Sequence, residues 1–148
     1  MSDELYNKAI IEAAKSDAHA GRLDHPGATA TADNPLCGDR VTLDLDVADG
    51  NMRKVRHKTR GCLLTRAAAS LIAAHAEGRP LAEAAALKAG AHAWLDGKAE
   101  EPPFAELAPL SPVRAVKSRH DCVTIAFDAL AEAAAHLSQA EDREETPK

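Results

Sequence analysis

The residues of this chain best suited to chemistry are its three cysteines and one aspartate. Cys37 and Asp39 lie two positions apart in the turn-forming sequence NPLCGD at 34–39, and Cys62 and Cys122 follow in distant segments. Thiolates bind soft metals and attack sulfur, whereas a carboxylate adds a hard, exchangeable oxygen ligand. Such a set suits tetrahedral zinc, or an iron–sulfur cluster held less tightly than by four thiolates. We expect these four side chains to converge on one site.

A small antiparallel sheet is expected to position the first pair. Asp39 to Val47 alternates apolar and polar side chains, which is typical of a half-buried strand. Asp49-Gly50 is a hairpin turn signal, and Met52 to Thr59 predicts the returning strand. A further short strand is expected near 28–32. Asp39 would therefore begin the first strand of a hairpin.

Helix N-termini are expected to position the other two thiols. Cys62 directly precedes a segment with apolar residues at helical spacing that ends at Gly78. Residues 118–121 have the S-x-x-D form of a capping box, which places Cys122 in or near the first turn of the last helix. Further helices are predicted to begin at Ser2, Pro80 and Ser111.

These positions bear on the reactivity of each thiol. Unpaired N–H groups and the helix dipole favour a thiolate at a helix start. We therefore expect alkylation of Cys62 and Cys122 in the metal-free protein well below the ordinary thiol pKa of about 8.5. Cys37 instead follows Pro35 and precedes Gly38, in a turn where its sulfur can be exposed and mobile.

Several residues have simpler interpretations. A single cysteine is often a small buried hydrophobe, and Asp39 could merely end a loop. Asp121 suits a helix cap better than a metal ligand, and His120 could be a ligand, a proton donor or a solvated residue. The basic run at 53–60 is most simply the solvated side of a strand, although it could also meet an acidic protein partner.

Composition narrows the class of protein. The chain has 148 residues, a net charge of -5 and 45% hydrophobic residues, which suits one soluble domain over 1–140 and a charged, disordered tail over 141–148. The acidic balance argues against nucleic acid as a partner, and no apolar run is long enough to span a bilayer. The acidic N-terminus is unlike a signal peptide, and an odd number of cysteines does not suit a disulfide framework. Both observations favour a cytoplasmic protein.

The motifs resemble those of the U-type iron–sulfur scaffold family (IscU, SufU and the N-terminal part of NifU) along nearly the whole chain. The resemblance is closest to the SufU branch, because the interval between Cys62 and Cys122 is long and Arg119 lies three positions before Cys122. The matching elements are Leu5-Tyr6, Asn34-Pro35-x-Cys37-Gly38-Asp39, Gly61-Cys62 with Ala69-Ser70, and Arg119-x-x-Cys122.

The resemblance implies an α+β fold in which a small antiparallel sheet packs against several helices. It implies an iron–sulfur cluster assembly scaffold that accepts persulfide sulfur at Cys37 from a pyridoxal-phosphate cysteine desulfurase of the SufS type. Cys37, Asp39, Cys62 and Cys122 would hold zinc, iron or a transient cluster beside an auxiliary Arg119, and recipient or carrier proteins would take the cluster. Such a scaffold is not an enzyme. Two alternatives remain, a zinc-dependent sulfurtransferase that relays persulfide without building clusters and a purely structural zinc domain.

Overall fold

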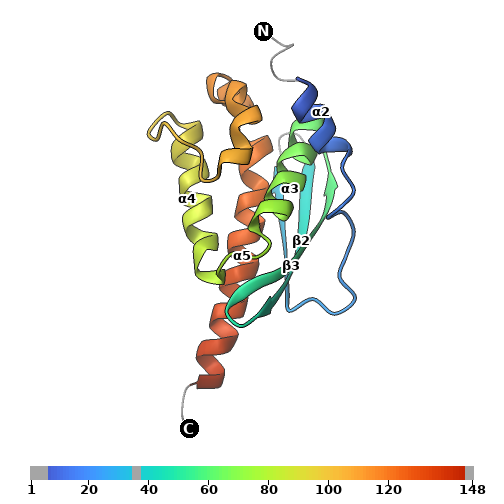
Figure 1. Ribbon diagram of the computed structural model, residues 1–148, viewed down its shortest axis with the longest axis vertical. Helices are drawn as coiled ribbons and strands as arrows, with labels where there is room; N and C mark the ends of the chain where they lie inside the picture. The colour runs from blue at the N-terminus through green and yellow to red at the C-terminus, as the bar shows by residue number, and fades with distance from the viewer. Residues whose placement is uncertain (1–6, 35–37, 146–148) are drawn as a thin grey trace.

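A three-stranded antiparallel sheet is covered on one face by helices in the computed structural model (Figure 1). The structure describes residues 7–34 and 38–145, with side chains as far as 137. The α+β fold expected from the sequence is confirmed. Among the described residues, no helix is both long and apolar enough to cross a membrane.

The sheet has the strand order β1-β2-β3. Strand β1 spans Ala28–Asn34, β2 spans Asp39–Ala48 and β3 spans Asn51–Arg60. Positive φ angles at Asp49 and Gly50 close the β2–β3 hairpin, as that dipeptide predicts. All three expected strands are therefore present, and each extends slightly beyond its predicted range.

Seven helical segments, four of them α-helices, precede or follow the sheet in the part of the chain that the structure describes. The α-helices are α2 (Lys8–Lys15), α3 (Leu63–Ala76), α4 (Ala84–Leu95) and α5 (His120–Glu145). The 3-10 helices are η1 (Leu81–Glu83), η2 (Ala105–Ala115) and η3 (Lys117–Arg119). The prediction of a helix start at Ser2 falls outside the described residues. The helix expected from Pro80 is present, but its first turn is the 3-10 helix η1.

The predicted capping box at Ser118 is wrong. Ser118 lies inside η3, which begins after Val116 and runs directly into α5. The N–H of His120 donates to the carbonyl of Lys117, so the backbone itself makes the bond that a side-chain cap would have supplied. Cys122 still falls in the first turn of α5, as expected.

Small side chains allow the helices to approach the sheet closely. Val41, Leu43 and Leu45 of β2 are fully buried on the helix-facing side. The alanine run Ala67, Ala68 and Ala69 of α3 is also fully buried. Alternation along β2 turns its other side chains to the outer face of the sheet. The core thus fixes which face of β2 is covered and which is left for polar groups.

A segment between α2 and β1, residues 20–27, crosses the outer face of the sheet and is called the crossing segment here. It starts beside β3, where Ala20 pairs with His57, and ends where the Gly27 N–H donates to the Leu45 carbonyl. Asp44 is buried beneath it. The crossing segment therefore divides the outer face into two ends.

Helix α5 reaches Glu145, so most of the segment from 141 onward, predicted as a tail, is helical. Residues 146–148 lie outside the described residues. The division into one domain over 1–140 and a disordered tail stays a prediction.

Candidate metal centre

Three of the four expected ligands meet at one end of the sheet. Asp39 is the first residue of β2, Cys62 is the N-cap of α3 and Cys122 lies in the first turn of α5. The two Sγ atoms are 3.6 Å apart, and the Cys62 Sγ is 4.0 Å from Oδ2 of Asp39. All three potential ligand atoms lie within 4.8 Å of one another. Segments distant in the sequence thus present two sulfurs and one oxygen to a common point.

Asp39 is held in place by neutral donors. The Cys62 N–H donates to Oδ1 over 3.2 Å, and the Thr65 hydroxyl donates to Oδ2 over 2.9 Å. The carboxylate can come this close because residue 61 is glycine, where a Cβ would lie 2.6 Å from the same Oδ1. Sequence reasoning missed Thr65, although its place three residues after the N-cap Cys62 is where a side chain can turn back to the helix start.

The two thiols share a proton unequally. The hydrogen bond between the Cys62 and Cys122 sulfurs outweighs the opposing effect of burial and lowers the pKa of Cys62 to about 5. Bonds from the hydroxyl and N–H of Thr65 lower it further. The same hydrogen bond to Cys62, together with burial, raises the pKa of Cys122. Early alkylation of both thiols stays a prediction: the lowered pKa favours it at Cys62, and the raised pKa opposes it at Cys122, because the pair retains one proton.

The donor set fits a metal ion. Two sulfurs and one carboxylate oxygen are three of the four ligands that tetrahedral zinc requires, and they also suit iron bound with sulfide. Metal would replace the proton shared by Cys62 and Cys122, since a coordinated thiol is deprotonated. The oxygen is the weakest soft-metal ligand of the three, so Asp39 is the one most easily exchanged.

Comparison with known proteins identifies the family of this chain. Residues 5–103 match the NifU-like N-terminal domain family. The chain belongs to this family. The match includes Asp39 and Cys62 but ends before Cys122.

Relatives of this NifU-like domain cover most of its length. The iron-sulfur cluster assembly scaffold protein IscU of Thermotoga maritima is 28% identical over 91% of this chain and 96% of its own. The zinc-dependent sulfurtransferase SufU of Bacillus subtilis is 23% identical over 86% and 88%. A crystal structure of a nitrogen-fixing NifU-like protein (N-terminal) from Brucella abortus superposes with a TM-score of 0.85 at 32% identity, covering 93% and 97%.

The remaining candidate residues of the NifU-like domain have mixed outcomes. Cys37 lies in the segment 35–37, outside the described residues, so its role as acceptor and ligand stays a prediction. Arg119 ends η3, three positions before Cys122, and its auxiliary role also stays a prediction. Asp121 is exposed and lies outside the three-residue cluster.

His120 turns away from the thiols. Its Nε2 contacts the Arg114 carbonyl over 3.1 Å, and its Nδ1 lies 3.7 Å from Asp96. The side chain is 12% exposed, so of the interpretations open from the sequence, His120 is neither a member of the three-residue cluster nor a solvated residue. The position of the His120 side chain is therefore set by contacts with η2 and with Asp96, away from the metal centre.

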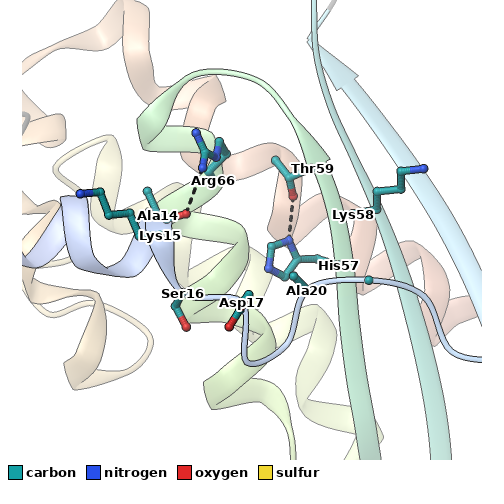
Figure 2. Close-up of a pocket in the computed structure, with 10 residues that line it drawn as sticks. Ala14, Lys15, Ser16, Asp17, Ala20, His57, Lys58, Thr59 and Arg66 are labelled. Carbon is teal, nitrogen blue, oxygen red and sulfur yellow. Dashed lines mark hydrogen bonds between the residues drawn. The ribbon is translucent and has the colours of Figure 1, made fainter.

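A separate hollow lies where the chain leaves α2 (Figure 2). It has a volume of about 280 Å³ between the end of α2, β3 and α3. Figure 2 shows Arg66 reaching the Ala14 carbonyl on one side and His57 bound to Thr59 on the other. Burial lowers the pKa of His57, which favours the neutral ring. The hollow contains none of the expected ligands and is distinct from the metal centre.

Proposed function

We propose that this protein is an iron–sulfur cluster assembly scaffold that receives sulfur from a cysteine desulfurase. The observation that carries the proposal is the convergence of Cys62, Cys122 and Asp39, with ligand atoms within 4.8 Å of one another. Similarity to IscU of Thermotoga maritima over nearly the full length of both chains supports it. Cys37, two residues before Asp39, is proposed as the fourth ligand and as the sulfur acceptor.

Sulfur would enter by thiol–disulfide chemistry. The Cys37 thiolate attacks the outer sulfur of a persulfide on the desulfurase, that S–S bond breaks, and the donor leaves as a thiolate. Cys37 then carries the persulfide beside iron, which is a substrate held by the other ligands. In this division of roles Cys62 and Cys122 anchor the metal, and exchange of Asp39 opens a position for incoming sulfur.

A zinc-dependent sulfurtransferase is the second candidate. It is favoured by the mixed sulfur and oxygen donor set, which suits zinc, and by the similarity to SufU of Bacillus subtilis. In this case zinc would occupy the same ligands, and Cys37 would relay persulfide without cluster formation. Both functions require a cysteine desulfurase as partner, and cluster assembly also requires recipient proteins. We place both activities in the cytoplasm.

Anaerobic reconstitution tests the proposal. The protein is incubated with ferrous iron, L-cysteine, a catalytic amount of cysteine desulfurase and excess dithiothreitol, which reduces the persulfide sulfur to sulfide, and the visible absorption spectrum is followed. We expect a cluster chromophore in the wild type, its loss in Cys62→Ser and its weakening in Asp39→Asn. Asp121→Asn is the matched control, because Asp121 is an exposed carboxylate outside the cluster, and it should behave as wild type.

Mass spectrometry of Cys37 separates the candidates. Persulfide on Cys37 with stoichiometric zinc and no chromophore would support the sulfurtransferase instead of the scaffold. Absence of both persulfide and chromophore in a folded wild-type protein would reject both functions and leave a structural metal site.

A further inference from the structure

The outer face of the sheet is basic beside the metal centre. Alternate side chains of β2 and β3 point to this face, where the register pairs Arg40 with Arg60 and Thr42 with Lys58. A hollow of about 290 Å³ lies at this end of the face. We call it the basic hollow, and its lining residues are Arg22, Arg40, Thr42, Lys58, Thr59 and Arg60.

Two of its four cations are already compensated. Arg22 binds Asp44 over 2.7 Å, and Arg40 binds Asp33 over 2.6 Å. Lys58 and Arg60 are exposed, and neither forms an ion pair within the part of the chain that the structure describes. The basic hollow therefore keeps two positive charges uncompensated in a chain whose net charge is -5.

The basic hollow adjoins the metal centre through the backbone. Arg40 directly follows Asp39, and Arg60 lies two residues before Cys62. The crossing segment limits the hollow at the other end, through Arg22. A molecule bound here would lie beside the end of the sheet that carries the ligands, without covering the sulfurs on the helix side.

We propose that the basic hollow docks an acidic segment of a partner protein, with carboxylates bound to Lys58 and Arg60. These residues are two apart on one strand, so their Cα atoms are separated by about 7 Å. That separation suits two successive outward carboxylates of an extended peptide better than one phosphate group. Asp33 and Asp44 already provide two examples of carboxylates bound by arginines on this face.

The chemistry of the lining favours protein over nucleic acid. Single-stranded nucleic acids are bound through aromatic side chains on which bases stack, and none of the described residues that line the basic hollow is aromatic. The proposal concerns charge alone and does not depend on cluster assembly, so it can fail or succeed independently of the proposed function.

A fluorescent peptide of alternating glutamate and serine is the probe for this surface. Fluorescence anisotropy at low ionic strength should show binding to the wild-type protein, and added salt should weaken it. We expect the double variant Lys58→Glu, Arg60→Glu to lower the affinity by about tenfold or more. The matched control is Lys98→Glu, Lys117→Glu, which changes the net charge equally at two exposed lysines outside the hollow. It should change the affinity by less than about twofold.

Four results would overturn the proposal. The first two are no binding of the peptide to the wild type at low salt and an equal loss of affinity in the control variant. The third is displacement of the peptide by low concentrations of inorganic phosphate. The fourth is a single-stranded oligonucleotide that binds more tightly than the peptide and requires Lys58 and Arg60. Circular dichroism checks that each variant is folded. If the charge-reversed protein does not fold, Lys58→Gln, Arg60→Gln replaces it and should weaken binding by about threefold.

Discussion

Two buried carboxylates on the same strand have opposite surroundings. Asp44, on the outer face of β2, receives hydrogen bonds from the Arg22 guanidinium, the Leu23 N–H and the Thr29 hydroxyl. Asp39, at the start of β2, is bound by the Cys62 N–H and the Thr65 hydroxyl, which are neutral donors. The first carboxylate has its counter-charge within the fold, and the second faces two sulfurs.

The difference separates a structural carboxylate from one available to a metal. Burial alone would raise the pKa of Asp44, but its hydrogen bonds and the charge of Arg22 outweigh burial and hold the pKa below its ordinary value. Because its charge is neutralised by Arg22 and its oxygens already accept hydrogen bonds, Asp44 is not available as a metal ligand. Asp39 instead adds a negative charge beside the Cys62 thiolate, and a metal cation would relieve the repulsion between them.

The largest expected effect concerns metal affinity. Asp39→Ala should lower zinc affinity by about a hundredfold, because it removes a charged ligand from the centre. Competition with a chromophoric chelator measures this change. Asp121→Ala should bind zinc as tightly as the wild type. An unchanged affinity in folded Asp39→Ala would break the contrast between the two carboxylates.

The second effect concerns stability. Asp44→Ala should lower the free energy of unfolding by about 2 kcal/mol, because the Leu23 N–H and the Thr29 hydroxyl lose a buried acceptor. Urea denaturation of the metal-free protein measures it. Asp39→Ala should lower the free energy of unfolding by about 1 kcal/mol in the same assay. The Cys62 N–H and the Thr65 hydroxyl, both neutral, would lose their acceptor at the edge of the core. Equal losses of unfolding free energy in the two variants would show that Asp44 is no more important to the fold than Asp39.

A smaller loss is expected from Gly61→Ala. The added Cβ would meet the Asp39 carboxylate and displace it, so zinc affinity should fall by about tenfold. The control is a double-mutant cycle with Asp39→Ala, in which the same substitution should have almost no further effect. A full tenfold loss in the Asp39→Ala background would show that Gly61 acts on something other than Asp39.

The smallest effect is a difference in how the free energy of unfolding depends on pH. The folded pKa of Asp44 lies below its unfolded value of about 3.9, so its contribution to stability is present above about pH 4 and is lost as the pH falls through the folded value. Urea unfolding between about pH 5 and pH 3 should show a shallower decline in Asp44→Asn than in wild type. Asp121→Asn, at an exposed position, should follow the wild-type curve.

Local sequence patterns predicted the strands and helix starts that carry Asp39, Cys62 and Cys122. The alternation of β2 and the Asp-Gly turn were sufficient for the hairpin, and Cys62 was expected at the start of α3, where it lies. The wrong capping box at Ser118 did not displace Cys122, because hydrophobic spacing determines the helix independently of its cap.

Contacts between distant segments could not be predicted in the same way. Asp44 belonged to the polar side of β2, and only the path of the crossing segment makes it buried and paired with Arg22. The binding of Thr65 to Asp39, and the proton shared by Cys62 and Cys122, depend on how α3 and α5 meet the end of the sheet.

The order of the ligands along the chain also bears on when the centre can form during synthesis. Asp39 and Cys62 are 23 residues apart, but Cys62 and Cys122 are separated by 60, and Cys122 belongs to the last helix. A nascent chain has no complete centre until α5 has been made and has packed against the sheet. Metal that binds only the finished site therefore stabilises the whole fold by mass action and stays absent from its incomplete forms.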